Sequence, residues 1–77
     1  MELVCVESSM IYAVGYDEET RTLEIVFNNG GIYRYADVPP EEYEGLLNAD
    51  SKGRYFLAHI RDVYAYWRVR PSSRRRR

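Results

Sequence analysis

The sequence predicts an α+β domain: a small antiparallel β-meander of three or four strands, two short helices packed on one face, and a C-terminal strand. The first half of the chain is rich in strand-forming residues, with a clear apolar–polar alternation at residues 23–27, and helical spacing begins only after a pair of prolines. At 77 residues the chain has room for one domain. We expect this domain over residues 1–69, followed by a flexible arginine-rich tail over residues 70–77.

The strand predictions rest on the side-chain pattern. Residues 3–6 are apolar and partly β-branched, and residues 10–16 are rich in strand formers without a clear alternation. Residues 23–27 alternate between apolar and polar side chains, which indicates a half-buried strand. Asn-Asn-Gly-Gly at residues 28–31 predicts a hairpin turn, because both residue types tolerate positive φ. The next strand is expected over residues 32–38.

The two helices are expected to follow the third strand of this meander. Pro39-Pro40 ends the sheet and suits a first helical turn, and Asn48 is a plausible end for that helix. Ser51 is a good N-cap for a second helix, and residues 63–69 alternate aromatic and small side chains as a last strand would. The expected core positions are Tyr43, Leu46, Leu47, Phe56 and Ile60 on the helices and Leu23, Ile25, Phe27 and Tyr35 on the sheet.

The net charge of −1 hides an uneven distribution. Residues 1–67 carry all twelve acidic residues against five basic ones, a balance of −7. Residues 68–77 carry six arginines and no acid, a balance of +6. An acidic body argues against a domain that binds phosphates over its whole surface, so any nucleic-acid contact is expected at the tail or at a local basic spot.

Cysteine and histidine each occur once. Because Cys5 is the only cysteine, an internal disulfide and a thiolate-based metal site are excluded. We expect Cys5 to be a small buried side chain. A lone thiol fits a reducing cytoplasm, and no apolar run indicates a signal peptide or a membrane span. His59 lacks partners for a metal site or a nucleophile–base pair, so we place it on the side of a helix. We therefore expect no catalysis, no metal and no cofactor.

Tyr33-Arg34-Tyr35 is the most informative stretch of the chain. Alternate residues of a strand share a face, so both rings point one way and the arginine points the other. A hairpin loop of odd length, such as residues 28–30, places Tyr33 opposite Ile25 and makes the rings core. A two-residue loop instead moves both rings to the more polar and accessible face. We favour the core alternative, since large rings dominate the cores of small domains.

Two basic segments are candidate phosphate sites. Free backbone N–H groups at the start of the second expected helix attract phosphate, and Lys52 and Arg54 add charge there. The alternative is an ordinary N-cap beside two solvated basic side chains. The arginine tail also has two interpretations. It is either an arm that binds nucleic acid in a salt-dependent manner or a solubilising segment.

A set of short sequence pieces recurs in order along most of the chain. The pieces are Ser8-Ser9-Met10-Ile11, Gly15-Tyr16-Asp17, Leu23 with Phe27, Gly31, Tyr33-Arg34-Tyr35, Val38-Pro39, Ala49-Asp50-Ser51-Lys52-Gly53, Tyr55-Phe56, and Ile60-Arg61 with Tyr64. Together they resemble the KTSC domain family, a short module found alone in bacterial and phage proteins and at the C-terminus of some lysyl-tRNA synthetases. The resemblance covers about residues 7–66, and Leu57 departs from the polar residue, often asparagine, expected at its position. The family has no established activity, and its association with synthetases suggests RNA binding.

Two functions are predicted. The first is a non-catalytic binding module for RNA or another nucleic acid, which uses a local basic-aromatic surface and the arginine tail. The alternative is a protein–protein interaction module or small regulator that docks on a larger host protein, because the body is acidic and rich in tyrosine. We expect a cytoplasmic protein without a membrane partner, and the oligomeric state stays open. The candidate nucleic-acid-binding residues are Tyr33, Arg34, Lys52, Arg54, Arg61, Tyr64, Arg74, Arg75, Arg76 and Arg77.

Overall fold

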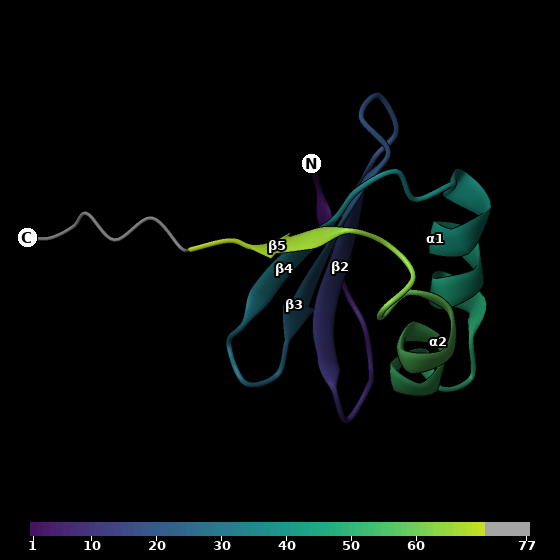
Figure 1. Ribbon diagram of the computed structural model, residues 1–77. Coiled ribbons are helices and arrows are strands. Elements are labelled where there is room, and N and C mark those ends of the chain that lie inside the picture. Colours follow the sequence, from purple (N-terminus) through teal and green to yellow (C-terminus); the bar gives the residue numbers. More distant parts are fainter. Residues whose placement is uncertain (71–77) are drawn as a thin grey trace, which may run out of the picture.

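The structure, a computed structural model, describes residues 1–70. Five antiparallel strands form one open sheet in sequence order, and two helices pack against one of its faces (Figure 1). The elements are β1 (Leu3–Cys5), β2 (Ile11–Asp17), β3 (Thr22–Phe27), β4 (Ile32–Tyr35), α1 (Pro40–Asn48), α2 (Lys52–His59) and β5 (Tyr66–Arg68). This architecture confirms the predicted α+β class. The meander has four strands, so the helices follow its fourth strand and not its third.

β2 contains a β-bulge between Ile11 and Ala13. Ile11 pairs with Phe27 on the face that the helices cover, whereas Ala13 pairs with Val26 on the other face. Without the extra residue these two side chains would share a face. The bulge therefore explains why residues 10–16 show no clean alternation, and it adds a fully buried Ile11 to the core.

The β3–β4 hairpin has the odd-length loop, residues 28–30, and this confirms the favoured register. Ile25 pairs with Tyr33, and Leu23 pairs with Tyr35. Both tyrosine rings consequently lie on the helix-covered face. Tyr35 is only 4% exposed, whereas Tyr33 lies nearer the β3–β4 turn and is half-buried.

Two strands are shorter than the sequence predicts. β4 ends at Tyr35 and does not reach residue 38, because Asp37 adopts a left-handed backbone conformation with φ +57°. β5 begins at Tyr66 and not at residue 63, because residues 61–64 form the turn that follows α2. A turn therefore limits each strand: it ends β4 early and makes β5 begin late.

Both helices begin as predicted. Pro39 is the N-cap of α1 with Pro40 in the first turn, and the helix ends at Asn48. Ser51 caps α2, where its Oγ accepts the backbone N–H of Arg54 at 3.3 Å. Such a cap stabilises a helix by about 1 kcal/mol, which matters for a helix of eight residues.

The core lies between the helices and the covered face of the sheet. Most predicted core positions are buried, namely Leu23, Ile25, Tyr35, Leu46, Phe56 and Ile60. The remaining three, Phe27, Tyr43 and Leu47, are partly buried and pack against the core. The prediction omits three fully buried side chains, Ile11, Val14 and Val38.

No helix of residues 1–70 packs on the other sheet face. The pairing of the strands aligns one row of side chains across it, from Leu3 through Glu24 and Arg34 to Trp67. Cys5 also lies on this face and is exposed, so the expectation of a buried cysteine is wrong. The reason is that β1 is an edge strand, and no element among residues 1–70 covers it on this face.

Candidate functional site

Five aromatic rings meet on the covered face, where the β3–β4 hairpin, α2 and β5 come together. The ring centroid of Phe27 lies 5.7 Å from that of Tyr33 and 5.3 Å from that of Phe56, both in edge-to-face geometry. The ring of Tyr66 lies 5.9 Å from Tyr33 and 5.6 Å from Tyr35. Aromatic pairs of this kind contribute about 0.5–1.5 kcal/mol each beyond their buried area, so the network holds β3, β4, α2 and β5 together.

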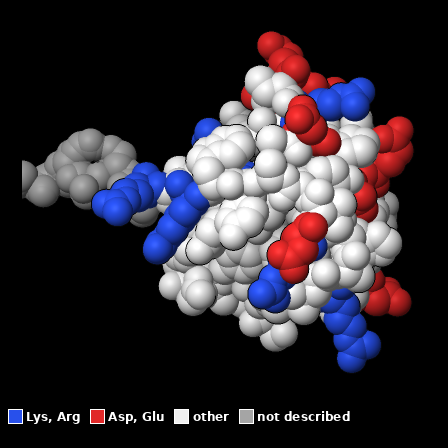
Figure 2. All heavy atoms as spheres, viewed as in Figure 1, with Lys and Arg blue, Asp and Glu red and all other residues white. Residues whose placement is uncertain are grey.

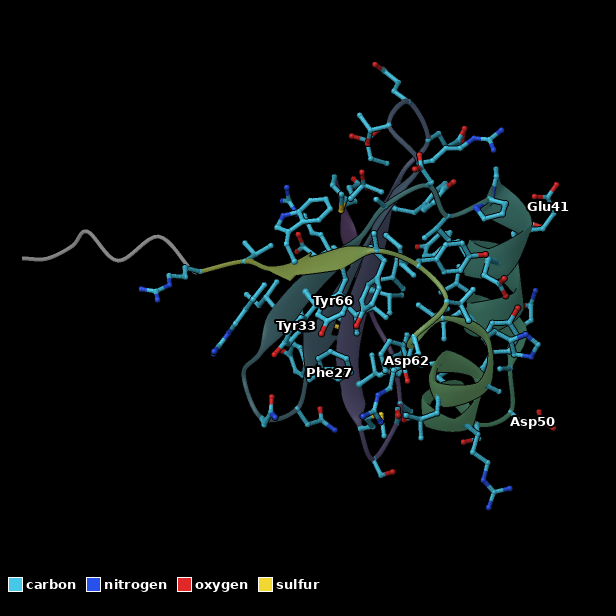
Figure 3. The ribbon with its side chains drawn as sticks, viewed as in Figure 1. Phe27, Tyr33, Glu41, Asp50, Asp62 and Tyr66 are labelled. Carbon is cyan, nitrogen blue, oxygen red and sulfur yellow. The ribbon has the colours of Figure 1, made fainter. Side chains whose placement is uncertain are left out.

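The outer rings of this network border a pocket of about 360 Å³, which we name the aromatic pocket. In Figure 3 the side chains of Phe27, Tyr33 and Tyr66 cluster between the hairpin and β5, and Asp62 lies on the side of α2. The volume is at the lower end of the range of small-molecule sites and suits one flat ring system. The pocket is lined by Met10, Phe27, Asn29, Tyr33, Phe56, Leu57, Arg61, Asp62 and Tyr66.

Pairing between β4 and β5 builds the sheet side of the pocket. Tyr66 lies opposite Tyr35, and Arg68 lies opposite Tyr33. Because cross-strand partners share a face, Arg68 belongs to the same face as the aromatic rings. The strand that supplies the last ring therefore also brings a cation beside the pocket.

The end of α2 builds the opposite rim. The backbone N–H of Arg61 donates to the Phe56 carbonyl at 2.9 Å, an i→i−5 bond that closes a wide turn at the end of the helix. Asp62 follows with φ +65°, a conformation that Asp adopts more readily than most residues. This turn places the Arg61 and Asp62 side chains next to each other at the mouth of the pocket, with Nε and Oδ2 3.9 Å apart.

Charge is separated across this side of the molecule. Figure 2 shows mostly acidic side chains over α1 and the β2–β3 turn, with basic ones beside them, and basic side chains near the C-terminal end of β5. The surface between these regions is uncharged except for acidic and basic side chains near its centre. A polyanion near this surface is therefore attracted toward the end of β5 and repelled from α1.

Several predicted basic residues lie away from the aromatic pocket. Arg34 points to the other sheet face, where its Nε lies 2.7 Å from Glu24 Oε1. The Nζ of Lys52 donates to the Ala49 carbonyl at 3.0 Å, and Arg54 is exposed at the start of α2. None of the three lines the pocket. The remaining predicted arginines, Arg74, Arg75, Arg76 and Arg77, lie outside the described residues.

Tyr64, a predicted stacking residue, belongs to a different cluster. Its hydroxyl donates to Glu42 Oε2 at 3.0 Å, and the Tyr55 hydroxyl donates to Oε1 of the same carboxylate at 2.6 Å. We name these three residues the tyrosine clamp, which joins α1, α2 and the turn before β5. The hydrogen bond to Glu42, together with burial, raises the pKa of Tyr55 to about 12. Burial, and then the same carboxylate, raises the pKa of Tyr64.

Two neighbouring residues shape the tyrosine clamp. A β-carbon at Gly45 would lie 2.7 Å from Cζ of Tyr55, so the absence of a side chain there lets the ring reach across α1 to Glu42. His59 stacks on Tyr55 with ring centroids 4.2 Å apart, and its Nδ1 lies 3.8 Å from Glu42 Oε1. His59 is exposed on the side of its helix, as predicted.

The structure thus brings two of the predicted site residues, Tyr33 and Arg61, into one pocket. Sequence reasoning missed Phe27, which it assigned to the core, and Asn29, Asp62 and Tyr66. Of these residues, only Tyr66 had a signal in the sequence, namely the alternation of aromatic and small residues over positions 63–69. That alternation did not show which of its aromatic side chains would meet the Tyr33 ring.

Metal-binding clusters and membrane-spanning helices are absent from the part of the chain that the structure describes. Across residues 1–70, no three His, Cys, Asp or Glu side chains are grouped so that they could hold a metal ion. Neither α1 nor α2 is long and apolar enough to cross a membrane.

The fold is also seen in a solved structure. The crystal structure of a KTSC domain protein from Yersinia pestis matches this chain with a TM-score of 0.87 and 35% sequence identity. The match covers 88% of this chain and 96% of the Yersinia pestis chain. At this identity the similarity extends beyond the general fold.

Sequence comparisons lead to the same family. An uncharacterized protein of Stutzerimonas stutzeri is 44% identical over 70 residues, which are 90% of this chain and 99% of that protein. A lysine–tRNA ligase of Nostoc punctiforme is 40% identical over 60 residues, which are 78% of this chain and 11% of the ligase. The sequence model of the KTSC domain matches residues 7–70. This chain therefore belongs to the KTSC domain family.

Proposed function

We propose that this chain is a non-catalytic module that binds single-stranded RNA, with one unstacked base in the aromatic pocket. The observation that carries the proposal is the convergence of Tyr33, Tyr66 and Arg61 on one pocket. Unpaired bases stack on tyrosine rings, and each stacked base contributes about 1–3 kcal/mol. Arginine contributes a cation that can meet a phosphate or a base edge.

Basic residues along one side of the pocket support a path for the phosphate chain. Arg68 lies opposite Tyr33, and Arg70 is exposed two residues later. The sequence adds four arginines at residues 74–77. The phosphates would follow this side, since the opposite side of the face is acidic.

A relative supports RNA as the ligand class by analogy. The lysine–tRNA ligase of Nostoc punctiforme carries a segment similar to this chain, and its name gives an RNA as its substrate. The segment is a small part of that enzyme, 11% of its length, so the analogy concerns binding and not the ligase reaction.

A protein partner is the second candidate function, and a different surface favours it. On the sheet face without helices, Leu3 and Trp67 are 47% and 46% exposed. Val26 and Ile32 lie on the same face and are partly exposed. Exposed tryptophan is common at the centre of protein interfaces, so a larger host protein could dock on this face.

Two neighbouring side chains of β5 separate these functions. Tyr66 and Trp67 are both about half exposed and point to opposite faces of the sheet. We expect Tyr66→Ala to weaken binding of a random single-stranded RNA about tenfold, and Trp67→Ala to leave it unchanged. Fluorescence anisotropy with the intact chain measures both affinities. Equal loss in the two variants, or no loss in either, would contradict the proposal.

The arginine tail needs its own control, because a polycation binds any nucleic acid. Replacing Arg74, Arg75, Arg76 and Arg77 with glutamine keeps the chain length and removes the charge. The slope of log affinity against log salt should then become less steep by up to about 3 units. The Tyr66→Ala effect should persist in this background. If Trp67→Ala instead removes a protein captured from nuclease-treated extract, the second function is supported.

A further inference from the structure

Two side chains of opposite charge, Arg61 and Asp62, lie at the rim of the aromatic pocket. The proposed function gives a role to Arg61 but none to Asp62. Arg61 and Asp62 are consecutive residues, and their side chains are 61% and 87% exposed. The 3.9 Å between Arg61 Nε and Asp62 Oδ2 is too long for a hydrogen bond. Within residues 1–70 no other cation lies within ion-pairing distance of the Asp62 carboxylate. Both groups are therefore free to bond a ligand in the pocket.

A carboxylate at this position selects against most parts of an RNA chain. Asp62 only accepts hydrogen bonds, and its charge repels phosphates. A base that enters the aromatic pocket beside Asp62 is favoured if it presents N–H donors to the rim. A planar carboxylate accepts best from two donors that lie side by side, one for each oxygen.

Guanine is the one RNA base with two adjacent ring-edge donor groups, N1–H and the 2-amino group. Its next two edge atoms, O6 and N7, are adjacent acceptors, which a guanidinium binds in a two-pronged manner. Around the edge of guanine the order is therefore donor, donor, acceptor, acceptor. The rim offers the complementary order, with a carboxylate next to a guanidinium.

Resting on the proposed RNA binding, we propose that the aromatic pocket is selective for guanine, with the ring stacked against Tyr33 and Tyr66. Asp62 accepts from N1–H and the 2-amino group, and Arg61 donates to O6 and N7. Adenine and cytosine each offer a single donor group on this edge, and uracil offers N3–H alone. They leave the carboxylate without a second partner, and an unmatched polar edge lowers affinity.

Single-base substitution in a short oligonucleotide tests this proposal. A labelled oligouridine with one central guanosine is compared with oligomers that carry adenosine, cytidine, uridine or inosine at that position. We expect guanosine to bind about tenfold more tightly than adenosine. Inosine lacks only the 2-amino group and should fall between them. The full chain is used throughout, at one low salt concentration.

Two conservative variants assign the preference to the rim. Asp62→Asn keeps the shape of the side chain, and asparagine tolerates the positive φ of this position, so the fold should be kept. It should remove the preference for guanosine over adenosine. Arg61→Lys retains the charge, loses the two-pronged donor and should reduce the preference for guanosine over 7-deazaguanosine, which lacks N7.

The outcomes separate this inference from the function on which it rests. A guanosine preference that Asp62→Asn abolishes supports both. Equal affinity for all central bases, or a preference that survives Asp62→Asn, overturns guanine selectivity and leaves RNA binding in place. No measurable binding to any oligomer overturns the proposed function and this inference together.

Discussion

The tyrosine clamp and the aromatic pocket use the same side chain in opposite ways. In the clamp, the hydroxyls of Tyr55 and Tyr64 both donate to Glu42, and the rings fill the space between elements. In the pocket, the hydroxyls of Tyr33 and Tyr66 make no side-chain hydrogen bond within residues 1–70, and the rings contact other rings. Both regions draw on the turn between α2 and β5.

The difference shows what determines the role of a tyrosine in a small domain. Where a carboxylate lies within reach, the phenol is fixed and stabilises the fold. Where no acceptor is near, the ring still packs against its neighbours and the hydroxyl stays available to solvent or to a ligand. We therefore expect substitutions in the clamp to change stability and substitutions in the pocket to change binding.

The largest effect is expected from removal of the carboxylate. Glu42→Ala leaves two half-buried phenols without their acceptor and should lower the free energy of unfolding by about 2 kcal/mol. Urea denaturation followed by tyrosine fluorescence measures this change, and RNA affinity below the transition should stay the same. Glu44→Ala, at an exposed position on the same helix, is the matched control and should change stability by less than about 0.5 kcal/mol. Similar losses in both variants would show that the clamp has no special role.

Removing single hydroxyls gives a smaller and sharper contrast. Tyr55→Phe loses one hydrogen bond to Glu42 and should destabilise the protein by about 1 kcal/mol. Tyr33→Phe removes a hydroxyl without such a partner and should leave stability unchanged within about 0.3 kcal/mol. Thermal unfolding of the two variants under one condition checks the difference. If Tyr33→Phe costs as much as Tyr55→Phe, the two regions do not differ in the way described.

Alkaline pH tests the same hydrogen bond without a substitution. The pKa of Tyr55 rises from 10.0 in the unfolded chain to about 12 in the folded protein, because the phenol donates to Glu42. Between these values the unfolded state loses a proton that the folded state keeps, so stability falls as pH rises from about 10 to about 12. Burial raises the pKa of Tyr35 to about 12 and adds to the fall.

The control for this pH dependence is Tyr55→Phe. Unfolding transitions measured from pH 9 upward should lose less stability in this variant, and the part due to Tyr35 should remain. An identical pH dependence in both proteins would remove Tyr55 from the explanation.

Local signals in the sequence predicted most of the fold. Pro39-Pro40 and Ser51 marked the helix starts because their preferences act on neighbouring backbone atoms. The hairpin register left two alternatives, and the favoured one is confirmed. The bulge in β2 could not be predicted, since the extra residue is identified only by its pairing with β3.

The aromatic pocket was much harder to predict, because it depends on contacts between distant residues. The 63–69 alternation treats Tyr64 and Tyr66 as equivalent. In the structure Tyr64 lies in a turn and is held by Glu42, whereas Tyr66 begins β5 and meets Tyr33. Cys5 was predicted wrongly for a related reason. Its burial would need another element to cover the edge strand β1, and no element within residues 1–70 does so.

The position of Tyr66 on β5 also sets the order in which the molecule can be completed. During synthesis the four strands of the meander and both helices leave the ribosome before β5 does. The rings of Phe27 and Tyr33 are therefore in place while one wall of the aromatic pocket is still missing. The aromatic pocket is therefore complete only after the last strand has paired with β4.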